Sequence, residues 1–243
     1  MIPLGDENDD GLGGPAYVNI AIIVLNILVY LYQAAHPSFT DGYSMIPREI
    51  VTGHDLIATQ HVTDTSGTSF PVPQAPGPSP IYLTLFTSLF MHASILHIAG
   101  NMLFLYIFGD NIERAFGSLR YFLFYIACGV VANLTMVVLD PTSVIPNLGA
   151  SGAIAGVLAA YIVLFPGNRV RVLAGYWLTT VPAAVMIGLW TVVQFLSLGG
   201  QQGGGVAYGA HVGGFLFGLL VAFFTRPSVM RRMPYHYLSD GEL

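Results

Sequence analysis

Ser151 stands in the run Gly149-Ala150-Ser151-Gly152, at the start of an apolar segment that continues to residue 165. Its hydroxyl could attack a carbonyl carbon if a neighbouring base removed the proton. A serine here also has a simple structural explanation, because serine is tolerated in membrane helices and often bonds back to its own helix. The rest of the chain must therefore decide between a chemical and a structural role.

His211 lies in a second apolar segment, and His97 and Asn101 lie in a third. An imidazole beside a serine hydroxyl is the minimum equipment for acyl transfer, because the ring takes the hydroxyl proton and later returns it to the leaving amine. His97 and Asn101 are one helical turn apart and share a helix face. With the backbone N–H of Ser151, they could stabilise the negative charge that develops on the attacked carbonyl oxygen.

None of the acidic residues in or next to the apolar segments is expected to lie near Ser151 and His211. Asp110 and Glu113 lie at the far end of the segment that carries His97, and Asp140 follows the next apolar segment. We therefore expect a serine–histidine dyad without a third acidic member. The histidine would then be oriented by packing or by another hydrogen bond.

Composition places this chemistry in a membrane. The chain of 243 residues is 54% hydrophobic and 9% charged, with a mean hydropathy of +0.66. Soluble domains carry roughly 25% charged residues, so this chain has too few to cover itself in water. The net charge of −5 excludes a nucleic-acid binder, and the single cysteine, Cys128, cannot form an internal disulfide. The N-terminus lacks the pattern of a cleavable signal peptide.

Six membrane-spanning helices are expected. The charge-free stretch 81–108 would be about 42 Å long as one helix, against roughly 30 Å of hydrocarbon. We therefore expect 81–91 to lie at the interface and the span to begin near residues 92–94. The six expected spans are residues 16–35, 92–108, 119–139, 149–165, 176–198 and 206–225.

These spans divide the chain into three parts. Residues 1–15 are predicted to be a mobile acidic tail, 16–226 a membrane domain and 227–243 a polar C-terminal tail. Residues 36–80 form a long first loop, which includes a short amphipathic helix within 45–60 and a proline-rich extended stretch at its end.

Arginine placement predicts the orientation. With the N-terminus inside the cell, seven of the eight arginines fall on the inner side and only Arg48 falls outside, which fits the positive-inside rule. The inner ones are Arg114, Arg120, Arg169, Arg171, Arg226, Arg231 and Arg232. Both termini are then cytoplasmic. The four polar residues Ser151, His211, His97 and Asn101 lie at a similar depth in their apolar spans, a little below the outer surface.

Small residues indicate which helices meet. Gly152 and Gly156 are four apart, and the 206–225 span contains two further such pairs, 209/213 and 214/218. This spacing lets helix backbones approach closely. A close crossing of the fourth and sixth spans would bring Ser151 within reach of His211.

Three motifs together resemble the rhomboid family of intramembrane serine proteases. They are His92-x-x-x-x-His97-x-x-x-Asn101, Gly149-Ala150-Ser151-Gly152 and Ala210-His211-x-x-Gly214, in the family's order on the second, fourth and sixth spans. The resemblance covers about residues 16–226. It implies an all-α, six-helix membrane bundle with cytoplasmic termini, Ser151 as nucleophile, His211 as general base, and an oxyanion hole of His97, Asn101 and the Ser151 N–H.

The resemblance extends to other segments and has departures. Residues 109–113 resemble a structural motif at the cytoplasmic end, 36–80 a membrane-dipping loop, and the fifth span with 199–205 a lateral gate and cap. Many members have Trp-Arg near the end of the first loop, where this chain has Ile81-Tyr82-Leu83. Many bacterial members place a tyrosine that stacks on the histidine at the position of Ala155, so His211 must be oriented by something else.

The expected function is cleavage of a peptide bond in the transmembrane segment of another membrane protein, through an acyl-enzyme and without a cofactor. The expected location is a prokaryotic plasma membrane. One alternative is an inactive rhomboid-like protein that binds membrane clients, although such relatives typically lack the serine or histidine. Another is a solute channel or transporter, although transporters usually show an internal repeat, and none is found.

Structural readings remain for individual residues. His92 is favoured as a loop-anchoring residue at the interface, and Gly149, Gly152 and Gly214 as packing positions that support the site. His97 and Asn101 could simply hold helices together. The three histidines could in principle bind a metal, but no acidic or cysteine ligand is near and their spacing suits one helix face poorly.

Overall fold

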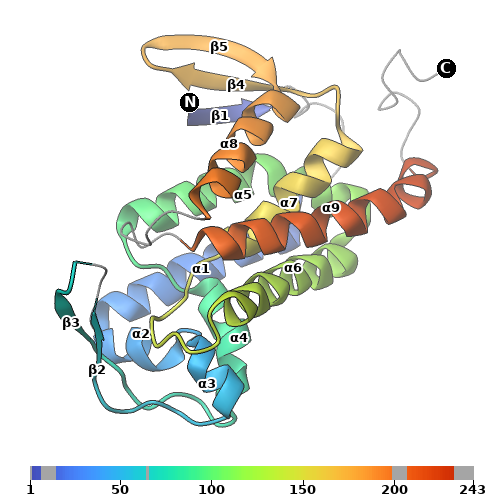
Figure 1. Cartoon of the computed structure of the whole chain (residues 1–243). Helices are drawn as coiled ribbons and strands as arrows, with labels where there is room; N and C mark the ends of the chain where they lie inside the picture. The colour runs from blue at the N-terminus through green and yellow to red at the C-terminus, as the bar shows by residue number, and fades with distance from the viewer. Residues whose placement is uncertain (1, 7–14, 64–65, 199–206, 233–243) are drawn as a thin grey trace.

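A computed structural model describes residues 2–6, 15–63, 66–198 and 207–232 (Figure 1). Four of the described helices are long and apolar enough to cross a membrane, and three shorter apolar helices accompany them. The long ones are α1 (Tyr17–Ala35), α5 (Ile95–Phe116), α6 (Ser118–Leu139) and α9 (Tyr208–Met230). The shorter ones are Ile81–Phe90, α7 (Ser151–Leu164) and α8 (Ala183–Ser197). The chain is thus mostly helical, as expected.

Helix α7 lies at the centre of the bundle. Eleven of its 14 residues are buried, and it packs against α5, α6 and α9. A helix of 14 residues is only about 21 Å long, which is less than the roughly 30 Å of hydrocarbon in a bilayer. Helix α7 alone is therefore too short to span the hydrocarbon.

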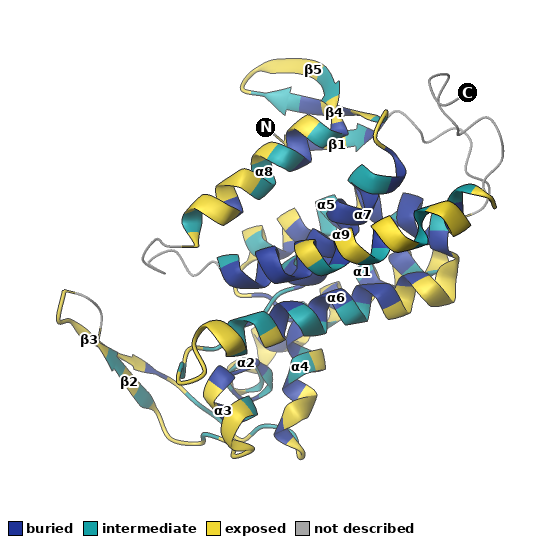
Figure 2. Cartoon of the chain, turned by 45° about the vertical axis from the view of Figure 1, so that its right-hand side comes forward, coloured by how far each residue is buried: buried dark blue, intermediate teal, exposed yellow. Residues whose placement is uncertain are grey.

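The outer surface of the bundle is apolar. Figure 2 shows α8 as largely exposed, whereas the helices behind it are buried. Large hydrophobic side chains such as Leu31 on α1, Leu196 on α8 and Phe224 on α9 are exposed. An apolar surface of this extent is unfavourable in water and favourable against lipid.

Glu113 joins α1 to α5. Its carboxylate is buried and accepts hydrogen bonds from the backbone N–H groups of Val18 (3.1 Å) and Asn19 (2.7 Å), and from the Ser118 hydroxyl (2.6 Å). The first N–H groups of a helix have no partner within the helix and carry partial positive charge. Glu113 therefore satisfies and neutralises the start of α1, a structural role that agrees with the one expected for residues 109–113.

Strands also occur, so the expectation of an all-α chain is wrong. Strands β1 (Ile2–Asp6), β4 (Arg169–Ala174) and β5 (Trp177–Pro182) form an antiparallel sheet in the order β1-β4-β5. Asp6 is buried and accepts hydrogen bonds from Asn111 (2.8 Å) and Tyr161 (2.6 Å). Residues 2–6 are therefore not the mobile tail that we expected; residues 7–14 of that prediction lie outside the described part.

The expected fifth span, 176–198, is wrong over its first third. Residues 169–174 alternate exposed arginine with buried valine, which is the period of a strand. Gly175, with φ of 64°, then turns the chain into β5, because glycine adopts positive φ without steric cost. Helix α8 begins only at Ala183. The hydrophobicity of β5 concealed this change of period.

The long first loop is largely folded. It contains α2 (Pro37–Tyr43), α3 (Pro47–Thr52) and the hairpin of β2 (Gln60–Thr63) and β3 (Ser69–Val72). The short helices η1 (Ile81–Leu83), α4 (Thr84–Thr87) and η2 (Ser88–Phe90) follow the loop, in the segment that was expected to lie at the interface. The helix expected within 45–60 is thus limited to α3. Met45 pairs with Asn147 through two backbone hydrogen bonds of 3.0 and 2.7 Å, so the loop is tied to the segment before α7.

The C-terminal boundary also shifts. Helix α9 continues through Pro227 to Met230, four residues beyond the predicted boundary at residue 226. Residues 233–243 of the expected tail lie outside the described part.

We predict that Glu113→Ala destabilises the fold. The change leaves buried N–H groups of α1 without an acceptor, which costs on the order of 3 kcal/mol. Thermal unfolding in detergent should show a clearly lowered midpoint. Asp140→Ala is the control, because it removes an exposed carboxylate whose described side-chain hydrogen bonds all go to Thr142, two residues later in the same turn. Equal midpoints for the two variants would contradict the role of Glu113.

We also predict that Glu49 makes the stability of the first loop depend on pH. Burial, with the nearby Asp55 carboxylate, raises the pKa of Glu49 from 4.5 to about 7. The protonated form is therefore favoured by folding, and its stabilisation is complete below about pH 4.5 and lost as the pH rises through about 7. The unfolding midpoint of the wild type should fall relative to Glu49→Gln between pH 5 and pH 8. A difference between the two proteins that stays constant with pH would refute this.

Candidate functional site

The segment before α7 positions Ser151 in the interior of the helix bundle. The Asn147 side chain donates to Asn133 of α6 (2.7 Å), and the Gly149 N–H donates to the Ser88 carbonyl (2.9 Å). Gly149 has φ of 136°, and a Cβ there would lie 2.9–3.0 Å from ring atoms of His97. Only glycine tolerates this backbone and this proximity. Glycine at residue 149, which was predicted to support the site, therefore allows the His97 ring to lie against the segment that leads into Ser151.

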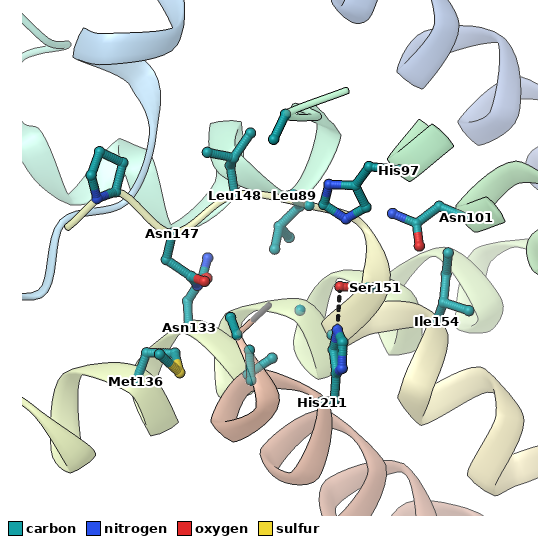
Figure 3. Close-up of a pocket in the computed structure, with 18 of the residues that line it drawn as sticks. Leu89, His97, Asn101, Asn133, Met136, Asn147, Leu148, Ser151, Ile154 and His211 are labelled. Atoms are coloured by element: carbon teal, nitrogen blue, oxygen red, sulfur yellow. Dashed lines mark hydrogen bonds between the residues drawn. The ribbon is translucent and has the colours of Figure 1, made fainter. Parts of the chain in front are cut away.

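Ser151 and His211 are hydrogen-bonded. The Ser151 Oγ and the His211 Nε2 are 2.6 Å apart, although the two residues are 60 positions apart in the chain (Figure 3). Ser151 is the first residue of α7, and His211 lies in the first turn of α9. The structure thus brings together the two residues that the sequence analysis selected as a pair.

Glycines allow this approach. A Cβ on Gly214 of α9 would overlap the carbonyl group of Gly152 on α7, and a Cβ on Gly218 would overlap the backbone of Gly156. The two backbones are therefore in direct contact over more than one turn. This contact sets the distance between the Ser151 and His211 side chains, so Gly152 and Gly214 support the site by packing.

Gln194 was missed by the sequence analysis. Its Oε1 lies 2.7 Å from the His211 Nδ1, on the opposite side of the ring from Ser151. The Trp190 ring of the same helix, α8, lies with its centroid 5.6 Å from that of His211. Gln194 and Trp190 thus contact the His211 ring, which Ala155 cannot orient. Ala155 is fully buried and has no polar atom in its side chain. A signal was available: Gln194 is an amide in an otherwise apolar helix, and such residues tend to face the bundle interior.

A cavity of about 820 Å³ lies beside the pair. His97, Asn101, Ser151 and His211 all line it, as Figure 3 shows. No described side chain caps the N-terminus of α7, which begins at this cavity. The free N–H groups and positive end of a helix attract negative charge. The cavity therefore combines polar donors with a hydroxyl and an imidazole.

His92 lies behind the cavity wall. It is buried, and its Nε2 accepts a hydrogen bond from the Asn101 Nδ2 (2.9 Å). Its backbone N–H donates to Gln33 of α1 (2.9 Å). His92 thus connects α1 to the residue that faces the cavity. Within the described residues, no three histidine, cysteine, aspartate or glutamate side chains are grouped so that they could hold a metal ion.

Comparison with known proteins assigns a family. The family model described as Rhomboid domain matches residues 80–228, which is more than half of the chain. The chain belongs to the rhomboid family. As a rhomboid with several long apolar helices, it is an integral membrane protein. The resemblance noted in the three sequence motifs is confirmed.

The curated relatives differ in what their names state. Rhomboid protease GluP of Bacillus subtilis is 32% identical over 57% of this chain and 25% of its own length. Inactive rhomboid protein 1 of Drosophila melanogaster is 39% identical over 39% of this chain and 6% of its own. The human presenilin-associated rhomboid-like protein, mitochondrial, is 30% identical over 56% of this chain and 36% of its own. This rhomboid therefore spans well under half the length of these relatives, and the family includes active and inactive members.

We predict that Gly214→Ala loosens the α7–α9 contact. The added methyl group would push α9 away from the Gly152 carbonyl, and overpacking of this kind costs about 1–3 kcal/mol. Gly188→Ala on α8 is the matched control, since its Cβ would meet no atom within 4 Å and alanine is favoured in helices by up to about 1 kcal/mol. Unfolding midpoints should move in opposite directions. A stable Gly214→Ala protein would refute the steric argument.

Proposed function

We propose that this chain is an intramembrane serine endopeptidase that cleaves transmembrane segments of other membrane proteins. The observation that carries the proposal is the 2.6 Å hydrogen bond between the Ser151 Oγ and the His211 Nε2 beside a cavity that His97 and Asn101 also line. A serine bonded to a neutral imidazole nitrogen is an activated nucleophile. The name of the Bacillus relative supports the same activity.

In the proposed reaction, Ser151 Oγ attacks the scissile carbonyl carbon while its proton moves to His211 Nε2. The resulting tetrahedral intermediate collapses as His211 returns that proton to the leaving amine, which gives an acyl-enzyme and the first product. Water then attacks the acyl carbonyl carbon while it gives a proton to His211 Nε2. This second tetrahedral intermediate collapses to the carboxylic acid product as the bond to Ser151 Oγ breaks and His211 returns the proton to that oxygen. The amine product carries away the original serine proton and water replaces it, so the pair is regenerated without a cofactor.

The proposed oxyanion hole consists of the Ser151 N–H, Asn101 and His97. The Ser151 N–H belongs to the uncapped start of α7, where the helix dipole favours negative charge. The Asn101 Nδ2 carries two hydrogens and uses one on His92, so the other is available to a ligand in the cavity. In this proposal His92 is a supporting residue that holds the Asn101 amide in place.

The membrane arrangement that we propose has six spans with both termini in the cytoplasm. The short helices α7 and α8 would then be spans completed by irregular segments or strands, and the arginine distribution supports the orientation. Ser151 would lie below the outer surface, with water reaching it through the cavity. We propose a prokaryotic plasma membrane as the location. A substrate helix must unwind locally to present its scissile carbonyl, so Gly, Pro or polar residues near the cut, and a small residue before it, should favour cleavage.

The second candidate is an inactive rhomboid-like protein that binds membrane clients. It is favoured by the identity of 39% to a relative that is named inactive. The retained Ser151 and His211 and their short hydrogen bond argue for the enzyme, since a client-binding protein has no need of an activated hydroxyl.

We predict that a fluorophosphonate probe labels Ser151 of the purified protein in detergent. Labelling should disappear in Ser151→Ala and fall by at least about 10³-fold in His211→Ala, because the base activates the hydroxyl. Ser143→Ala is the control, since Ser143 lines the same cavity but has no described contact with His211. Labelling that survives in Ser151→Ala would disprove the assigned nucleophile. A folded wild type that resists labelling and cleaves no membrane substrate would favour the client-binding candidate.

A further inference from the structure

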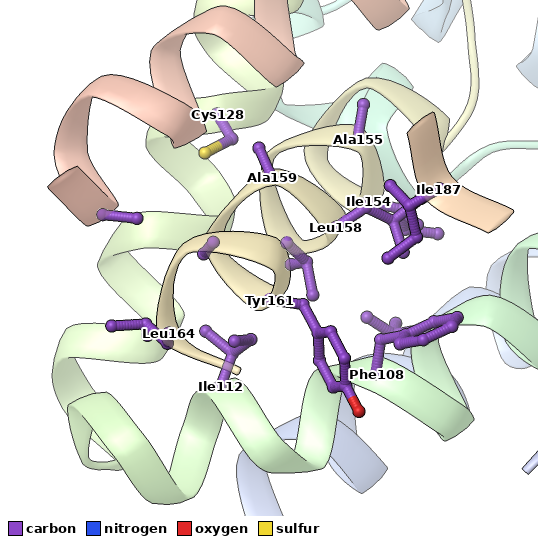
Figure 4. Packing of buried hydrophobic residues seen from close by; sticks show 14 of the residues in the cluster. Phe108, Ile112, Cys128, Ile154, Ala155, Leu158, Ala159, Tyr161, Leu164 and Ile187 are labelled. Atoms are coloured by element: carbon purple, nitrogen blue, oxygen red, sulfur yellow. The ribbon is translucent and has the colours of Figure 1, made fainter. Parts of the chain in front are cut away.

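Helix α8 is held to the bundle unevenly. Its first turns bury Ala183, Met186 and Ile187, and Figure 4 shows Ile187 beside Ile154 and Leu158 of α7. From residue 188 onward, Gln194 is the one buried residue of this helix. The second half of α8 is therefore mostly apolar and exposed or half-buried, and Gln194 is its one buried side chain, in contact with α9.

The hydrogen bonds of Gln194 determine which of its atoms faces His211. Its Nε2 lies 3.4 Å from the Trp190 carbonyl oxygen, one turn earlier in the same helix, so this nitrogen is the donor to that carbonyl. The remaining Oε1 faces the His211 Nδ1 at 2.7 Å. An amide oxygen only accepts hydrogen bonds, so the proton of this bond belongs to His211 Nδ1.

This assignment selects one histidine tautomer. A neutral imidazole carries one N–H, and with that proton on Nδ1 the Nε2 has a free lone pair. Nε2 is the atom 2.6 Å from the Ser151 Oγ. The other tautomer would place an N–H toward Ser151 and leave two lone pairs facing each other at Gln194. Gln194 therefore favours the only neutral form of His211 that can accept the serine proton.

We propose that Gln194 is the positioning residue of the Ser151–His211 pair, and that α8 thereby controls whether His211 can act as a base. The inference rests on the proposed protease function. During attack, the Ser151 proton moves to Nε2 and the Nδ1 proton stays bonded to Gln194 Oε1, which remains neutral throughout. A movement of the second half of α8 away from α9 would break this bond, and His211 could then adopt either neutral tautomer. The state of α8 and the reactivity of Ser151 are then coupled.

The test compares three variants of the full-length protein in detergent. Gln194→Met keeps the length of the side chain and removes the acceptor, whereas Gln194→Glu keeps an acceptor oxygen. Phe195→Met places the same new residue at the next position, which is exposed and outside the site. We measure the kcat and KM for a transmembrane substrate, the rate of fluorophosphonate labelling, and the nitrogen chemical shifts of His211 in ¹⁵N-histidine protein, assigned by the signal lost in His211→Ala.

We expect Gln194→Met to lower kcat and the labelling rate by about 10- to 100-fold with little change in KM, which is less than the roughly 10⁴-fold effect of removing a charged orienting group from a triad. Its His211 spectrum should change from the Nδ1–H form to a mixture of tautomers. Gln194→Glu should recover most of the rate, and Phe195→Met should match the wild type in every measurement.

The nitrogen spectrum separates this inference from the proposed function. A wild-type His211 protonated on Nε2, or a Gln194→Met protein with an unchanged spectrum and full labelling, would overturn the role of Gln194 while leaving the protease function intact. An unreactive Ser151 with the tautomer shift still present would overturn the protease function alone. A loss of rate in Gln194→Met that is matched by Phe195→Met would show a general effect of the substitution and would also overturn the inference.

Discussion

The site depends on one constraint, the direct contact of the α7 and α9 backbones. Gly152 meets Gly214 and Gly156 meets Gly218 with no room for a side chain between them. Without hydrophobic attraction between helices in lipid, such close packing is a main source of association. It also fixes the relative height of the two helices. Ser151 and His211, at the start of each helix, therefore meet within hydrogen-bond distance without a flexible connection.

Buried polar groups hold the rest of the bundle to this pair. Glu113 caps α1 from α5, Gln33 of α1 holds the backbone of His92, and Asn133 of α6 holds Asn147 before α7. Water is absent from the hydrocarbon, so an unpaired polar group there costs several kcal/mol. Each bond has only one satisfactory geometry. The polar network thus positions the elements around the cavity, while apolar packing supplies most of the stability.

Helix α8 contributes differently from the others. It is anchored by its first turns, and its second half touches the site through Gln194 and Trp190. Ser151 and His211 are therefore held by the buried centre of the bundle, whereas the proposed orienting partner of the imidazole, Gln194, comes from the largely exposed second half of α8. A pair without an acidic third member needs such an acceptor, because packing alone does not distinguish two tautomers of nearly identical shape.

The sequence by itself determined the membrane class, the approximate positions of α5, α6, α7 and α9, and the pairing of Ser151 with His211, because apolar length, glycine spacing and motif order are local properties of the chain. Tertiary structure alone decided the pairing of β1 with β4 and the contact of Gln194 with His211. Strand β1 pairs with β4 across more than 160 positions, and its five-residue sequence is too short to show a periodicity that reveals this partner. Gln194 reaches His211 only because of how α8 is rotated against α9, and rotation of a helix is set by its packing and not by its composition.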